Sequence, residues 1–221
     1  FKKDLRIIGD CHSYFIEHPD LRSKLLETFP ERVSGNLRKR TRKEIERLKE
    51  AWKYTHEKNF NSSFLENLTP EVIINIGKII YPDGEGFRDA RVSLGLESYV
   101  PPNPLRVPEL IEKFCYEVKT SDYHPVEVAA VSHLTIAGIQ PFRDGNKRVA
   151  RLIQDRVLED YQLPPAIIYS GERDIYIDLL ELGLVGLRDN ELSKQRPFFD
   201  YIGGKVNCIL DEVINDLGTF H

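Results

Sequence analysis

Residues 139–151 concentrate groups that could bind a phosphorylated ligand. The segment reads Ile-Gln-Pro-Phe-Arg-Asp-Gly-Asn-Lys-Arg-Val-Ala-Arg and runs into a stretch of helical periodicity. Gly145 and Asn146 permit the positive φ of a tight turn. The helix that follows would point its N-terminal N–H groups and the positive end of its dipole into that turn. We therefore predict a loop that holds a polyphosphate.

Charged side chains in the same segment would complete such a site. Arg148 and Arg151 are three residues apart, so both can project from one side of the helix towards an anion. A guanidinium suits this role because its planar fork can grip two phosphate oxygens. Asp144 supplies the hard oxygen ligand that Mg²⁺ prefers. These residue types predict a polyphosphate bridged by magnesium.

The segment resembles the signature of the Fic/Doc family, H-x-F-x-[DE]-[GA]-N-[GK]-R-x-x-R. Gln140 stands where the family has its histidine. Segments around the motif also resemble the family, namely the helix before the loop, a flap over residues 86–102 and a later Arg-x-x-Tyr pattern at Arg173 and Tyr176. The positions that match the signature are Phe142, Asp144, Gly145, Asn146, Lys147, Arg148 and Arg151.

The resemblance implies an all-α fold, the Fic helical bundle, with a small β-hairpin as its flap. We expect an N-terminal helical region over residues 1–60 and the Fic core domain over residues 61–221. Hydrophobic periodicity agrees with a helical protein. Thr69 and Pro70 indicate a helix N-terminus. Helices are predicted over 42–58, after 70, after 108, after 125, directly after the loop, over 174–184 and over 195–217.

The resemblance also implies an activity, the transfer of AMP from Mg-ATP to a hydroxyl side chain of a target protein. The family histidine takes the proton from that hydroxyl, whereas the Gln140 amide has no proton-accepting state near pH 7. We expect an almost intact nucleotide site with impaired chemistry. The resemblance assigns catalytic positions to Gln140, Asn146 and Arg148, magnesium binding to Asp144, and anchoring of the loop to Phe142. It assigns ATP binding to Gly145, Asn146, Lys147, Arg148, Arg151 and Tyr176.

Two alternative functions remain open. Lys147 is the residue found in the Doc branch, whose members phosphorylate their target, although Gly145 and Arg151 look like the adenylylating branch. The replacement at Gln140 also fits a non-catalytic module that binds nucleotide or protein. Tyr176 is expected either to line the adenine pocket or to be an ordinary core tyrosine, and His133 is expected to be a packed structural residue.

The flap is the expected docking place for the target protein. Val92, Ser93 and Leu94 could offer backbone groups to an extended segment of the target, which would add as a strand. The alternative is a hairpin that only covers the core.

Two segments resemble the family's inhibitory helix, [ST]-x-x-x-E-[GN], whose glutamate pairs with the second motif arginine. Residues 13–18 include Ser13 and Glu17 but have His18 in the last position, while residues 62–67 fit the pattern fully. We favour Glu17 as the partner of Arg151, against the alternative that no inhibitory helix operates.

Composition excludes several classes of partner. The net charge of −4 and the isoelectric point near 5.9 argue against a dedicated nucleic-acid binder. No apolar run is long enough to span a membrane. The three cysteines are far apart and form no C-x-x-C pair, which favours a reducing, cytoplasmic setting. Whether the chain forms homo-oligomers is left open.

Overall fold

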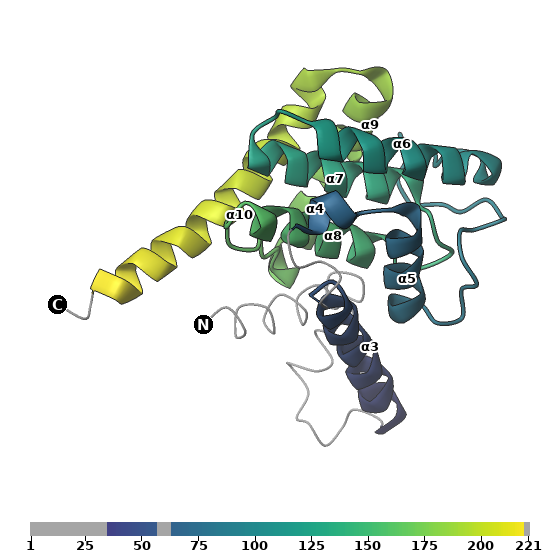
Figure 1. Ribbon diagram of the computed structural model, residues 1–221, viewed down its shortest axis with the longest axis horizontal. Coiled ribbons are helices and arrows are strands. Elements are labelled where there is room, and N and C mark those ends of the chain that lie inside the picture. Colours follow the sequence, from purple (N-terminus) through teal and green to yellow (C-terminus); the bar gives the residue numbers. More distant parts are fainter. Residues whose placement is uncertain (1–34, 57–62, 219–221) are drawn as a thin grey trace.

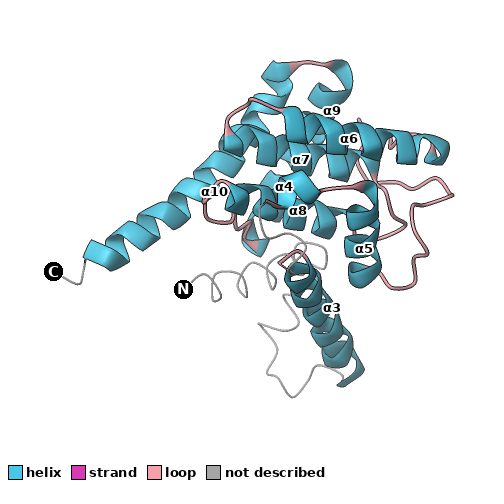
Figure 2. Ribbon diagram, in the orientation of Figure 1, coloured by secondary structure: helices cyan, strands magenta, loops and turns pink. Residues whose placement is uncertain are grey.

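The structure is a computed structural model that describes residues 35–56 and 63–218. Within these ranges the regular elements are all helices (Figures 1 and 2). This confirms the predicted all-α class. None of these helices combines the length and the apolar composition that a membrane crossing requires. The elements are α3 (Gly35–Tyr54), α4 (Phe64–Asn67), α5 (Pro70–Ile80), η3 (Pro104–Arg106), α6 (Val107–Thr120), α7 (Pro125–Ile139), α8 (Asn146–Asp160), η4 (Ser170–Glu172), α9 (Arg173–Asp189) and α10 (Leu192–Gly218).

Local signals in the sequence set where several helices begin. The Thr69 hydroxyl accepts a hydrogen bond of 3.3 Å from the Val72 N–H, and Pro70 occupies the first position of α5. At the start of α7, the His124 ring accepts from the Val126 N–H and Pro125 follows directly. The predicted start of α5 is therefore confirmed, together with its mechanism.

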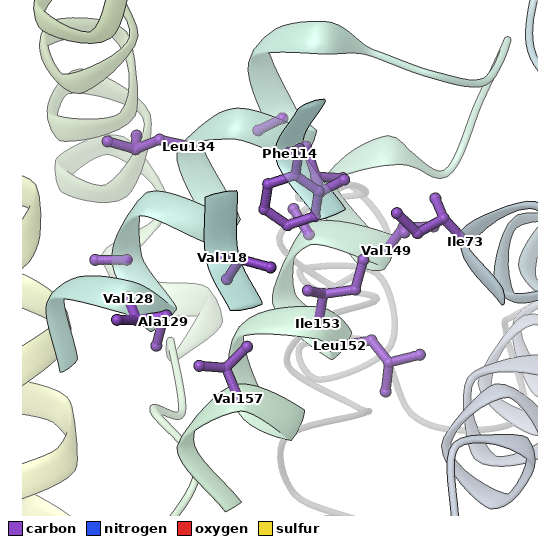
Figure 3. Close-up of a cluster of buried hydrophobic side chains, with 14 of the residues drawn as sticks. Ile73, Phe114, Val118, Val128, Ala129, Leu134, Val149, Leu152, Ile153 and Val157 are labelled. Atoms are coloured by element: carbon purple, nitrogen blue, oxygen red, sulfur yellow. The ribbon is translucent and has the colours of Figure 1, made fainter. Parts of the chain in front are cut away.

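Helix α7 lies at the centre of the bundle. It packs against α6, α8, α9 and α10, and residues on all its faces are buried. A helix that is apolar all round belongs in the interior of a protein. Figure 3 shows the core between α6, α7 and α8, where Phe114 and Val118 meet Val128 and Ile153. The two helices that flank the candidate site, α7 and α8, thus lie in the packed core of the molecule.

Helix α3 lies at the edge of this bundle, below α5 in the view of Figure 1. It packs against α5 and buries Leu48 and Ala51 (Figure 1). Beyond its C-terminal end, His56 contacts Glu159 at the end of α8, with 2.9 Å between the ring nitrogen and the carboxylate oxygen. The guanidinium of Arg156 lies 5.6 Å from the centre of the Trp52 ring. These contacts hold the C-terminal end of α3 against the end of α8.

The expected flap hairpin is absent from the described part of the chain, and residues 81–103 form an irregular loop (Figure 2). Gly95 has φ +71° within this segment, and the Ser98 N–H donates to the Glu181 side chain rather than to a neighbouring strand. Leu94 and Tyr99 pack against the core. An isolated two-stranded ribbon is at best marginally stable, so side-chain contacts with the bundle order the loop instead.

Phe142 joins helix α5 to the loop between α7 and α8. Its side chain is buried and its ring lies directly over Gly77. A Cβ atom at position 77 would lie 2.2 Å from Cζ of Phe142, far inside van der Waals contact. Gly77 is therefore needed because the aromatic ring occupies the space that any other side chain would fill.

We predict that Gly77→Ala destabilises the protein by about 1–3 kcal/mol, because the Phe142 ring must move out of a packed core. Gly204→Ala is the matched control, since Gly204 also lies in a helix but a Cβ there meets no atom within 4 Å. The control should be stabilised by up to about 1 kcal/mol through higher helix propensity. Chemical denaturation measures both. Equal stability of Gly77→Ala and the control would contradict this account of Phe142.

Candidate functional site

Residues 140–146, here called the motif loop, reverse the chain between α7 and α8. The reversal begins at Gln140, which has the left-handed conformation φ 51°, ψ 62° and ends α7. A non-glycine residue in this region costs about 1–3 kcal/mol and persists only where its surroundings enforce it. The Gln140 side chain is buried, donates to the Ala137 carbonyl at 2.7 Å and accepts from Asn146 at 3.0 Å.

Asn146 closes the motif loop from the other end. Its side-chain oxygen accepts from the Phe142 N–H at 2.8 Å, and its amide nitrogen donates to the Phe142 carbonyl at 2.8 Å and to the Gln140 side chain. Both polar atoms of the Asn146 side chain are thus hydrogen-bonded within the loop. This side chain holds the two ends of the turn together.

Gly145 lets the chain enter α8 with an open N-terminus. It has φ +80°, and a Cβ there would lie 2.9 Å from Cγ2 of Ile80. Gly145 is the N-cap of α8, and no side chain provides a capping hydrogen bond there. The first N–H groups of a helix have no partner within the helix, so such an end attracts anions. Beside it, the Asp144 carboxylate is 65% exposed and accepts from the Gly145 N–H.

Arg148 is held by a carboxylate from α3. Its guanidinium lies 3.1 Å from Oε2 of Glu44, and both side chains are buried, with exposed fractions of 5% and 10%. A second carboxylate, Asp144, lies 3.5 Å away at the surface. The Arg148 guanidinium therefore lies between a buried and an exposed carboxylate.

Arg151 points towards Tyr176, which is fully buried on α9. Its guanidinium lies 5.8 Å from the ring centre, and it donates to the Tyr176 hydroxyl at 3.4 Å. The hydroxyl lies 2.9 Å from Nε2 of His133, and Nδ1 of His133 lies 2.8 Å from the side-chain oxygen of Gln154. The neutral Nδ1–H tautomer of His133 satisfies both contacts. One buried chain of hydrogen bonds thus leads from Arg151 into the core.

The remaining predicted positions lie around this centre. Lys147 is half-buried in the first turn of α8. In the 81–103 loop Ser93 is exposed, while Val92 and Leu94 are half-buried. Ser13 and Glu17, which we expect to belong to an inhibitory helix, lie outside the described residues.

The other candidate inhibitory segment lies at the far end of α8. Ser63 caps α4 and donates to Asp160, whose carboxylate also accepts from the Phe64 and Leu65 N–H groups. Asp160 is nine residues after Arg151, or about 14 Å along the helix. Glu66 is exposed in this region. The segment therefore does not lie against the motif arginines.

Two side chains that the sequence did not single out hold the motif loop and the start of α8 in place. Glu44 lies in a charged stretch that resembles a solvated helix face, and only its burial against Arg148 distinguishes it from its neighbours. Arg88 lies in the flap segment and reaches the backbone at the end of α7. Arg143 adds an exposed bridge to Asp89, and its hydrogen bond lowers the pKa of that carboxyl.

Comparisons with known proteins agree with this geometry. Residues 67–158 match the model of the Fic/DOC family. The chain contains a Fic/DOC family domain. Proteins called "Protein adenylyltransferase Fic" from Drosophila grimshawi and Aedes aegypti are each 31% identical to it over 139 residues, which is 62% of this chain. The chain spans only about a quarter of their length, 27% and 26%.

Solved structures share the fold of this domain. Fic-1 from C. elegans superposes with a TM-score of 0.74 at 21% identity, covering 98% of this chain and 64% of that chain. A Fic-domain signalling protein from Bacteroides thetaiotaomicron gives a TM-score of 0.71 at 22% identity, covering 92% of this chain and 83% of that chain. The helical architecture around the motif loop is therefore that of Fic proteins.

We predict that Glu44→Gln destabilises the protein by about 3 kcal/mol, because the buried Arg148 guanidinium would keep only the exposed Asp144 as a charged partner. Glu46→Gln is the matched control, because Glu46 forms an exposed pair with Arg42 on the same helix. Its loss should change stability by no more than about 1 kcal/mol. Urea unfolding measures both variants. A Glu44 variant as stable as the Glu46 control would show that the buried pair contributes nothing.

We also predict that Tyr176→Phe costs about 1–3 kcal/mol, since it removes the hydroxyl between Arg151 and His133 while keeping the buried ring. Tyr123→Phe, at an exposed tyrosine, is the control and should have almost no effect. Thermal and chemical unfolding report the difference. If the two variants are equally stable, the hydrogen-bond chain does not stabilise the domain.

Proposed function

We propose that the motif loop binds Mg-ATP and that this Fic domain is built to transfer AMP to a hydroxyl side chain of a target protein. The observation that carries the proposal is the turn at Gly145. It leaves the N-terminus of α8 without a side-chain cap, directly beside the exposed carboxylate of Asp144. A helix N-terminus that adjoins a hard oxygen ligand suits a phosphate group with its metal ion.

The residues around the turn fit this ligand. The backbone N–H groups at the start of α8 would contact phosphate oxygens, since the Asn146 side chain is engaged within the loop. Within the described ranges no group of three or more His, Cys, Asp or Glu side chains could form a metal site of its own. Magnesium commonly binds through one or two carboxylates together with waters and phosphates, so Asp144 suffices on the protein side. Bound magnesium would neutralise phosphate charge.

The two motif arginines would bind the outer phosphates. Arg148 already lies beside the exposed Asp144, and Glu44 holds it from the buried side. Arg151, one turn further along α8, donates a hydrogen bond to the hydroxyl of Tyr176 on α9. Because both guanidinium groups are positioned before any ligand arrives, little conformational entropy would be lost on binding.

Gln140 is the reason to expect impaired chemistry. Deprotonation of the target hydroxyl needs a base, and a neutral amide is not one at pH 7. The Gln140 side chain is also engaged on both sides, because its nitrogen donates to the Ala137 carbonyl and its oxygen accepts from Asn146. Nucleotide binding should therefore persist while transfer is slow.

Two other functions share the same site. A non-catalytic module that binds nucleotide is favoured by the engaged amide of Gln140. A kinase of the Doc type is favoured by Lys147, whose ammonium in the first turn of α8 could reverse the orientation of the nucleotide.

We predict that Gln140→His increases transfer of label from ATP to protein about 10²–10⁴-fold, the usual contribution of a positioned general base. Two ATP preparations, labelled at the α- or the γ-phosphate, separate AMP transfer from phosphorylation. Label from α-phosphate alone is expected.

Gln162→His is the matched control for this experiment. Gln162 has the same positive φ, at 61°, but lies exposed after α8, so its replacement should leave transfer unchanged. If the Gln140 variant binds Mg-ATP yet transfers no label, the non-catalytic reading is the correct one. Transfer of the γ-phosphate label would favour the kinase.

A further inference from the structure

Arg88 joins the 81–103 loop to the end of α7 through hydrogen bonds to backbone carbonyls. Its Nε donates to the Gln140 carbonyl at 2.6 Å, and Nη2 donates to the Ile139 carbonyl at 3.3 Å. Nη2 also donates to the Pro102 carbonyl at 2.6 Å, and Nη1 donates to the Ala90 carbonyl at 2.9 Å. One buried side chain therefore contacts two separate points of the 81–103 loop, Ala90 and Pro102, and the first residue of the motif loop.

The backbone of Arg88 adds a further link. Its N–H donates to the Pro141 carbonyl at 2.8 Å. The backbone and side chain of Arg88 thus donate hydrogen bonds to three consecutive carbonyl groups, at positions 139, 140 and 141. The motif loop is thus held at the point where the chain adopts its left-handed turn.

The chemistry of this contact requires arginine. The last carbonyl groups of a helix have no partner within the helix, and the negative end of the helix dipole lies there. A cation with several directed donors satisfies both needs, and the guanidinium uses four of its five N–H groups here. Within the described residues Arg88 forms no salt bridge with a carboxylate. Burial lowers the pKa of this guanidinium, which is the cost of placing it among carbonyl groups alone.

We propose that Arg88 is a positioning residue that enforces the left-handed backbone at position 140 and couples the 81–103 loop to the motif loop. The two loops then move as one unit. The meaning of this coupling rests on the proposed function, because it would let a target held by the 81–103 loop and a nucleotide held by the motif loop strengthen each other's binding. Such coupling is reciprocal by thermodynamic necessity.

A second bridge between the same loops differs from Arg88 in burial. Arg143 contacts Asp89 at 2.6 Å, but both side chains are largely exposed, at 59% and 77%. Exposed ion pairs contribute little to stability. We therefore assign the coupling to Arg88 and not to this pair.

The test compares Arg88→Lys, which keeps the charge and loses the fork, with Arg91→Lys, a matched change at an exposed arginine of the same loop. Hydrogen exchange is followed by NMR in the ligand-free protein. In Arg88→Lys, the amides at positions 88, 140 and 142 should exchange at least tenfold faster. The Tyr81 and Val128 amides, which bond to Gly77 and His124, should keep their rates, and Arg91→Lys should change none of the five. Unchanged rates at 88, 140 and 142, or equal acceleration of all five, would overturn the proposal.

A measurement on the unmodified chain tests the role of Arg88 even if the Arg88→Lys variant does not fold. The Arg88 Nε–H should exchange far more slowly than the Nε–H of Arg91, because it is buried and bonded to the Gln140 carbonyl. Equal exchange of the two groups would overturn the assignment.

Addition of Mg-ATP separates this inference from the proposed function. Mg-ATP should slow exchange at positions 140 and 142 in the unmodified chain and in Arg88→Lys, but at position 88 only in the unmodified chain. Slowing at position 88 in both proteins would overturn the coupling. If Mg-ATP affects neither protein, the proposed function fails, while the ligand-free comparison still decides the role of Arg88.

Discussion

The structure depends on a tight reversal of the chain between two buried helices. Helices α7 and α8 pack along each other, so the motif loop must turn within a few residues and cannot use water for most of its polar groups. Asn146 closes the turn from inside, and Arg88 holds it from outside. The left-handed conformation at Gln140 exists because these partners surround it. The open N-terminus of α8 is a direct product of the same turn.

Electrostatics around this turn follow from burial. Charged groups leave water only when partners compensate them, and three buried arginines near the site illustrate this. Arg148 has a carboxylate from α3, Arg151 has a tyrosine hydroxyl from α9, and Arg88 has backbone carbonyls. Three elements far apart in sequence thereby fix side chains that meet at one site. Such positioning matters in any phosphate site, since a guanidinium that is already oriented loses little entropy on binding.

Much of the fold could be predicted from local signals. The Thr69–Pro70 start of α5 follows from capping chemistry, and its apolar face follows from hydrophobic spacing. The prediction of a β-hairpin in the flap was wrong. The weak alternation of residues in the 81–103 loop did not reveal that the loop bonds to the helical bundle, as the Ser98 N–H does to Glu181, and not across a pair of strands. Glu44 was missed because an acidic residue in a charged helix resembles its exposed neighbours. Only the approach of α3 to α8 buries it.

The sequence by itself determined the motif loop, the order of residues within it and the family to which the domain belongs. These are local properties, since glycine, asparagine and arginine act there over one turn of chain. The tertiary structure alone decided which partners hold this region, namely Arg88 for the loop, and Glu44 and Tyr176 for the arginines of α8. The reason is physical: an ion pair or hydrogen bond between distant residues depends on how helices pack, and no local pattern of residues encodes that distance.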